Sequence, residues 1–365
     1  MRSRAGSGAR SPSEGKRSSA VHRMRSNGDE IEGDETTGNR VITGPKRVRT
    51  RVAADEILAA YGAPDPACED TSVQRVVTAE LDLELGSSVD LIFQVAAAQH
   101  VPIVSEELTF TQGERVYTPT EIVDQSGSRL HRLTGEAGRL EVRYEATVDG
   151  QTTSGRTSDL EAITYLRPSR YCQSDEVFGQ ARRQFKGLQG HDLIAAVSEF
   201  VSTSTTYTPG LSQGTDSAVT TLMTGQGVCR DYAHVVISLL RAMDMPARYA
   251  ACFAPGLQPM DFHAVAEAYH DGAWYVIDAT RLANRRSLVR IATGRDAADC
   301  AFLSYHGGHV GLSHMRVDAW VMPDAASADG LEGAGRPDAL ERAMDDGAAA
   351  SDPSLDDFTT LIQLA

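Results

Sequence analysis

The amino-acid sequence predicts an α+β protein in which an antiparallel, β-sandwich-like domain precedes a core of helices and antiparallel strands. The first observation is the strict alternation of apolar and polar residues in 77–85 and 139–148, which is typical of strands with one buried and one solvated face. The second is a change to helical spacing of the apolar residues, which is clearest in 229–243. The third is the return of strand-like runs in 263–270 and 273–280.

The length and composition are those of a globular protein of about two domains. The chain has 365 residues, of which 41% are hydrophobic and 23% are charged. Its net charge of −15 disfavours nucleic acids and anionic membrane surfaces as partners. No apolar run approaches the ~20 residues of a membrane span, and the basic N-terminus lacks the apolar segment of a secretory signal. We therefore expect a cytoplasmic protein without nucleic-acid or membrane partners, and we leave its oligomeric state open.

Composition divides the chain into four parts. A basic segment rich in Arg, Ser and Gly is expected to be disordered, and an acidic tail closes the chain. Between them, period-two patterning gives way to helical patterning near a Pro-containing stretch. The expected parts are the basic segment 1–52, a β-rich domain 53–165, a core domain of helices and strands 166–322 and the acidic tail 323–365.

The elements follow from local periodicity and from the turn residues between them. In the β-rich part we expect a short helix at 53–62 and strands at 77–85, 89–96, 106–111, 121–124 and 139–148. In the core we expect helices at 175–185, 191–202, 216–225 (with Asp216 as N-cap and Gly225 as its end) and 229–243. These are followed by strands at 247–254, 263–270 and 273–280, a short helix at 295–303, a last strand at 315–322 that closes the core domain, and a docking helix at 355–364 in the tail.

Five cysteines stand far apart in the sequence and form no C-x-x-C pair: Cys68, Cys172, Cys229, Cys252 and Cys300. Their odd number and wide spacing argue against a disulfide framework or a thiolate zinc site, and they fit a reducing compartment. We therefore expect no cofactor.

Three histidines, His306, His309 and His314, lie in a glycine-rich segment and have a spacing that can bind zinc. No cysteine or carboxylate pattern accompanies them. We therefore expect a loop that leads into a strand, and no metal.

Cys229 stands just after Gly225 and Gly227 and directly before the strongest predicted helix. The thiolate is the nucleophile in thiol chemistry, and the unpaired amides and dipole of a helix N-terminus favour an anion there. The glycines allow a sharp turn and leave room for a substrate carbonyl near the backbone, whose amides could hold a developing oxyanion. The alternative is a buried structural cysteine that follows a common glycine turn.

His263 and Asp278 are the expected partners of this thiolate, since it needs a base and a group that orients the base. The Asp271–Gly272 dipeptide predicts a two-residue hairpin turn. Antiparallel pairing then places His263 opposite about Thr280, with Asp278 on the same face, at a diagonal of about 7–8 Å between backbones. Taken singly, the histidine could be an ordinary core or surface residue and the aspartate a strand-end cap.

Together, the segments "GQGVCRDYAH", "MPARY", "DFHAV" and "WYVIDAT" resemble the transglutaminase-like superfamily of papain-related cysteine enzymes, and "TYTPG" is similar to that family's lead-in. The resemblance extends over about 73–322 and is closest to bacterial transglutaminase-like proteins with a β-rich N-terminal domain. It implies a papain-like core with Cys229 as nucleophile on a helix N-terminus, and with His263 as base and Asp278 as its orienting group on an antiparallel sheet.

Two positions depart from the family pattern. Val265 stands where Trp often follows His-Ala, and Ala279 stands where Pro usually follows Asp. Neither change removes a reacting atom. For a second oxyanion donor the candidates are Gln226, three residues before the cysteine, and Tyr207, in the lead-in; their alternative interpretations are a solvated turn residue and a core tyrosine.

The expected function is cysteine-dependent acyl transfer on a protein or peptide-like amide, through a thioester intermediate. We favour hydrolysis, as in a cysteine peptidase or amidase, because water is always present and no lysine-binding tunnel is evident. Transamidation of protein glutamine by the same three residues, and a non-catalytic protein-binding module, are the alternatives.

Overall fold

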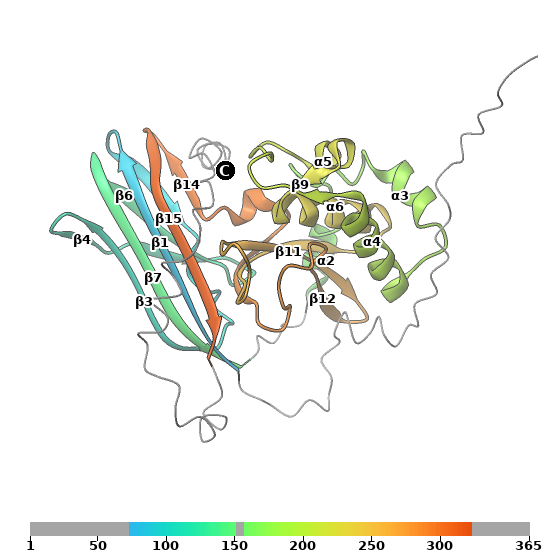
Figure 1. Ribbon diagram of the computed structural model, residues 1–365, viewed down its shortest axis with the longest axis horizontal. Helices are drawn as coiled ribbons and strands as arrows, with labels where there is room; N and C mark the ends of the chain where they lie inside the picture. Colours follow the sequence, from blue (N-terminus) through green and yellow to red (C-terminus); the bar gives the residue numbers. More distant parts are fainter. Residues whose placement is uncertain (1–72, 151–156, 323–365) are drawn as a thin grey trace, which may run out of the picture. The chain divides into compact units, whose positions relative to one another are not determined.

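The computed structural model describes residues 73–150 and 157–322 (Figure 1). The predicted disordered segment 1–52, the helix at 53–62 and the acidic tail 323–365 with its docking helix lie outside the described residues. Within the described part of the chain, no helix combines the length and the apolar character that crossing a membrane requires.

Two antiparallel sheets form the β-rich part, as the alternation predicted. The first has the order β15-β1-β7-β3-β4, from strands β1 (Gln74–Leu85), β3 (Ile103–Gln112), β4 (Arg115–Tyr117), β7 (Gly138–Asp149) and β15 (Val310–Val321). The second has the order β14-β2-β6-β5, from β2 (Val89–Phe93), β5 (Thr120–Val123), β6 (Arg129–Gly135) and β14 (Leu303–His306). Phe93 of the second sheet contacts Phe110 of the first, with ring centroids 5.2 Å apart.

The last two strands complete these first two sheets, because β15 pairs with β1 and β14 pairs with β2. The expectation that a strand at 315–322 closes the core domain is therefore wrong. Alternation within one strand shows which face is buried, but it does not show which strand pairs with it. The division at 165/166 stays a prediction, since one buried apolar cluster extends from the β1 residues to helix α6 (Cys229–Ala242).

Helix α6 is the centre of the helical part. The other helices are α2 (Asp159–Thr164), α3 (Phe178–Gln184), α4 (Gly190–Ser204) and α5 (Ala218–Thr224). The apolar stripe predicted one buried face for α6, yet every residue from Arg230 to Ala242 is buried. The reason is that α6 is covered by more than one layer: α3, α4 and α5 pack against it (Figure 1), and a third sheet contacts it as well. Helix α5 begins after Ser217, so the expected N-cap Asp216 is wrong, whereas Gly225 ends the helix with a left-handed φ of 67°.

A third antiparallel sheet, with the order β12-β11-β10-β13, contacts α6. Its strands are β10 (Ala247–Phe253), β11 (His263–His270), β12 (Ala273–Ile277) and β13 (Val289–Gly294). The helix expected at 295–303 is a single 3₁₀ turn, η1 (Ala297–Cys300), because β13 ends just before it and β14 begins just after it. A two-residue parallel pair, β8 (Thr206–Tyr207) with β9 (Gln226–Gly227), leads into α6.

Candidate active site

The two glycines before Cys229 have different structural roles. Gly225 has the left-handed φ of 67° that reverses the chain after α5. Gly227 has an ordinary φ, but a Cβ built on it would lie 2.6 Å from Cβ of Asp231 in the first turn of α6. The β9 backbone therefore approaches the helix more closely than any side chain would allow. This approach places Cys229 at the first position of α6, next to the end of β9.

The N-terminus of α6 is capped from within the helix. Val228 is the N-cap and has no side-chain acceptor, so the cap bond comes from Asp231, whose Oδ2 accepts the Val228 N–H at 2.9 Å. Cys229 is partly exposed, whereas Cys172, Cys252 and Cys300 are buried. Among the described cysteines, Cys229 is thus the thiol that a solvent-borne reagent reaches first.

The β11–β12 hairpin brings His263 and Asp278 together as the turn predicted. Asp271 and Gly272 both have positive φ, at 47° and 82°, which fits a two-residue hairpin turn. His263 opens β11, and Asp278 directly follows β12. Nε2 of His263 lies 3.0 Å from Oδ2 of Asp278, and the two residues are 2% and 7% exposed.

The carboxylate of Asp278 is fixed on both oxygens. Its Oδ1 accepts the backbone N–H of Thr280 at 3.0 Å and the Thr280 hydroxyl at 2.5 Å, and its Oδ2 also accepts the Ala283 N–H at 3.3 Å. Burial by itself raises the pKa of Asp278, but the hydrogen bonds from His263 and Thr280 outweigh it and lower that pKa. Asp278 is therefore held as a carboxylate that orients the imidazole.

His263 is influenced by both of its expected partners. Burial by itself lowers the pKa of the imidazole. The hydrogen bond to Asp278 and the adjacent Cys229 side chain outweigh this effect and raise the pKa to about 10. Its Nδ1 is buried and has no hydrogen-bond partner among the described residues. One ring nitrogen is thus bound to the orienting carboxylate, and the other is unpartnered beside a thiol.

Of the two oxyanion candidates, the structure brings Tyr207 to the site. Burial raises the pKa of the Tyr207 hydroxyl, and so do the neighbouring side chains of Cys229 and Asp261, whereas the backbone amide of Cys229 lowers it. The hydroxyl therefore lies close to that amide. The side chain of Gln226 is exposed and has no hydrogen bond within the described part of the chain, which fits the solvated turn residue.

Asp261 belongs to the site and was missed from the sequence. Burial raises the pKa of its carboxyl to about 6, although the Phe262 N–H, 2.6 Å from Oδ1, and the nearby His263 both lower it. Asp261 stands two residues before His263, and residues at that spacing share one face of an extended chain. The spacing in "DFH" was a signal that could have identified it.

Comparisons with known proteins identify relatives of this chain in one superfamily. Residues 181–279, which contain Cys229, His263 and Asp278, match the family model of the transglutaminase-like superfamily. The crystal structure of a suspected cysteine protease from Cytophaga hutchinsonii is 33% identical, with coverage of 69% of this chain and 92% of that chain and a TM-score of 0.63.

Two further proteins are more distant. The periplasmic domain of TgpA from Pseudomonas aeruginosa, bound to ethylmercury, is 18% identical, with coverage of 64% of this chain and 95% of that chain and a TM-score of 0.32. An uncharacterized protein of Mycobacterium leprae (strain TN) is 24% identical over 148 residues, which are 37% of this chain and 52% of that protein. The match therefore spans about half the length of this curated relative.

Proposed function

Because the chain belongs to the transglutaminase-like superfamily, we propose that it is a cysteine-dependent acyl-transfer enzyme that acts on amide bonds. Cys229 is the nucleophile, His263 the general base and acid, and Asp278 the group that orients the imidazole. The observation that carries this proposal is the buried 3.0 Å contact between Nε2 of His263 and Oδ2 of Asp278, with the free Nδ1 beside the thiol at the start of α6.

The proposed reaction follows from the protonation states of His263 and Cys229. A His263 ring with a pKa of about 10 holds a proton at neutral pH, and this is the form that pairs with a thiolate. The Cys229 thiolate attacks the amide carbonyl carbon, the C–N bond breaks, and the imidazolium gives its proton to the departing amine. A thioester remains. Water then attacks the thioester carbon while His263 takes a proton from it, and the C–S bond breaks. The products are a carboxylic acid and the original pair of Cys229 thiolate and His263 imidazolium.

The developing negative charge on the carbonyl oxygen has two donors nearby. The Cys229 amide belongs to the unpaired first turn of α6 and points to the side where an anion is favoured. The Tyr207 hydroxyl lies close to the same amide. We propose that these two groups bind the oxyanion.

We propose hydrolysis of a peptide-like amide as the outcome of the reaction. The Cytophaga hutchinsonii relative is itself a suspected cysteine protease, which supports this choice. Transamidation differs only in that an amine, not water, attacks the thioester. We also propose a reducing compartment, the cytoplasm, with support from the four free cysteines of the described residues.

The test is turnover of a panel of peptide and peptidoglycan-like amides by wild type, Cys229→Ala and Cys300→Ala. Cys300 is a buried thiol in η1 and serves as the matched control. We expect Cys229→Ala to lose the activity and Cys300→Ala to keep it. Full turnover by folded Cys229→Ala would overturn the proposal. Adding a primary amine separates the two outcomes, because a transamidase forms the amide of that amine whereas a hydrolase forms the acid.

A further inference from the structure

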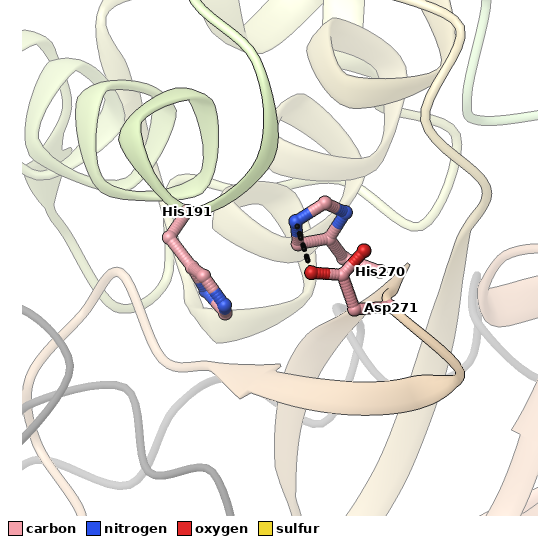
Figure 2. A group of neighbouring side chains, drawn as sticks. All are labelled: His191, His270 and Asp271. Carbon is pink, nitrogen blue, oxygen red and sulfur yellow. Dashed lines mark ion pairs between the residues drawn. The ribbon is translucent and has the colours of Figure 1, made fainter.

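We propose a divalent transition-metal site, of the kind that binds Zn²⁺, where the start of α4 meets the β11–β12 hairpin. Its ligands are His191, His270 and Asp271, whose ligand atoms all lie within 4.8 Å of one another. Figure 2 shows the His191 side chain extending from the helix, beside the imidazole and carboxylate of the hairpin. The proposal does not depend on the function proposed above.

Each of the three proposed ligands has a defined position in the secondary structure. His191 is the second residue of α4, His270 is the last residue of β11, and Asp271 begins the turn. Nε2 of His270 lies 3.3 Å from Oδ2 of Asp271. The rings of His191 and His270 have centroids 5.0 Å apart and planes at 82°, so the two imidazoles are already in edge-to-face contact.

The donor set has the chemistry of a zinc-type site. Two imidazole nitrogens and a carboxylate oxygen suit Zn²⁺, and the same set accepts Cu²⁺ or Ni²⁺. A tetrahedral ion with bonds of about 2.1 Å needs ligand atoms about 3.4 Å apart. Nε2 of His270 and Oδ2 of Asp271 are already 3.3 Å apart, so the remaining adjustment, from separations of at most 4.8 Å, falls on His191. Water would complete the coordination.

A buried, unpartnered nitrogen makes this cluster different from an ordinary surface ion pair. Nδ1 of His191 is buried and has no hydrogen-bond partner among the described residues. A buried ring nitrogen usually has a partner. The ring is held at its edge by Tyr275, with centroids 4.7 Å apart, so it does not simply turn its nitrogen to solvent. A metal bound at this nitrogen would supply its missing partner.

The backbone beside His191 leaves room for the opposite ring. Gly190 has a φ of 54°, and a Cβ built on it would lie 2.6 Å from Nε2 of His270. Only glycine allows the helix start to approach the hairpin this closely. The site is also separate from the candidate active site, since His270 and His263 stand at opposite ends of β11, about 23 Å apart at ~3.3 Å per residue. A bound ion would therefore fasten α4 to the far end of the strand that carries His263.

The experiment is a Zn²⁺ titration of the chelator-treated full chain by calorimetry, together with the Tm at each metal concentration and the visible spectrum of the Co²⁺ form. The measurements are made in the Cys229→Ala background, because a reactive thiol beside an imidazole would itself bind zinc. We expect one equivalent to bind, the Tm to rise with metal concentration, and the Co²⁺ form to show absorption bands of tetrahedral geometry.

The variants are His191→Ala, His270→Ala and Asp271→Asn, and the control is His306→Ala, an exposed histidine at the end of β14. We expect at least a tenfold weaker Zn²⁺ affinity in each of the three and no change in the control. Asn tolerates the positive φ at 271, so this variant keeps the test valid if a histidine variant does not fold. The proposal is overturned if no equivalent binds, or if the three variants bind Zn²⁺ as tightly as their parent.

Discussion

Replacing Glu267 by Gln should destabilise the sheet that carries His263. Glu267 lies in β11 and is 1% exposed, between Arg248 of β10 and Arg290 of β13. Its Oε2 accepts from Nε of Arg248 at 2.7 Å and from Nη1 of Arg290 at 2.9 Å, and its Oε1 accepts from Nη2 of Arg290. One buried carboxylate thus joins three strands through two guanidinium groups.

The size of the expected stability loss follows from the charges around Glu267. Burial raises the pKa of Glu267, but the two arginines outweigh it and lower that pKa from its usual 4.5 to about 2. At 1.36 kcal/mol per pKa unit, this lowering of the Glu267 pKa contributes about 3 kcal/mol to the free energy of unfolding at neutral pH. Breaking a buried ion pair by removing one partner costs about 3–5 kcal/mol, because the other charges stay buried and uncompensated. The two estimates agree, so we expect Glu267→Gln to lose about 3 kcal/mol of unfolding free energy.

The pH dependence gives a second test of the same group. A carboxyl whose pKa is depressed in the folded state contributes stability above its unfolded pKa, and this contribution is lost as the pH falls through the folded pKa. For Glu267 the loss therefore occurs between about pH 4.5 and about pH 2. The wild-type protein should lose this increment on acidification, and Glu267→Gln should lack it.

The assay is urea-induced unfolding of wild type, Glu267→Gln and the control Glu199→Gln. Glu199 pairs with Arg281 at the surface, with side chains 60% and 57% exposed, and such pairs contribute about 0–1 kcal/mol. The reasoning is refuted if Glu267→Gln costs no more than Glu199→Gln, or if both proteins have the same acid dependence between pH 4.5 and 2.

Three further predictions concern the site. Asp278→Asn removes the carboxylate that raises the pKa of His263, so the ring should titrate below its present value of about 10 in NMR spectra and kcat/KM should fall on the order of 10³-fold. Tyr207→Phe removes a proposed oxyanion donor, so kcat should fall about 10²-fold while KM is unchanged in steady-state kinetics. Gly227→Ala places a Cβ 2.6 Å from Asp231, so thermal unfolding should show a loss of about 1–3 kcal/mol.

Each of these has a distinct contrary result. An unchanged His263 titration in Asp278→Asn would mean that the carboxylate does not set the protonation of the ring. A change in KM alone for Tyr207→Phe would assign the hydroxyl to ground-state binding and not to the oxyanion. A Gly227→Ala protein as stable as wild type would show that the chain accommodates the side chain by moving β9.

Features encoded by short-range patterns could be predicted from the sequence. The Asp271–Gly272 turn fixed the β11–β12 register, and the observed pairing of Ala266 with Ile277 is the one that this turn requires. The apolar stripe of 229–243 located α6 to within one residue at its end. Strict alternation located β1 and β7, which lie next to each other in the first sheet.

Features that depend on distant or very short segments could not be predicted. Strand β15 pairs with β1 from the opposite end of the described chain, and local periodicity carries no information about that pairing. Strands β8 and β9 have two residues each, too few for any period, and the six residues of helix α2 make fewer than two helical turns. The position of Tyr207 beside Cys229 depends on this β8–β9 pair. The sequence therefore yielded the three proposed reacting residues but could not choose between the two oxyanion candidates.

The most direct test of the central claim is the rate at which each cysteine of the native protein reacts with iodoacetamide at pH 6, measured by mass spectrometry of the peptides. A thiol with the ordinary pKa of 8.5 is only about 0.3% thiolate at that pH. If the Cys229 thiol shares its proton with His263 as proposed, Cys229 should react much faster than the same cysteine in the urea-unfolded chain, and His263→Ala should abolish the difference. Equal rates for Cys229 in the native and unfolded chains would contradict the account.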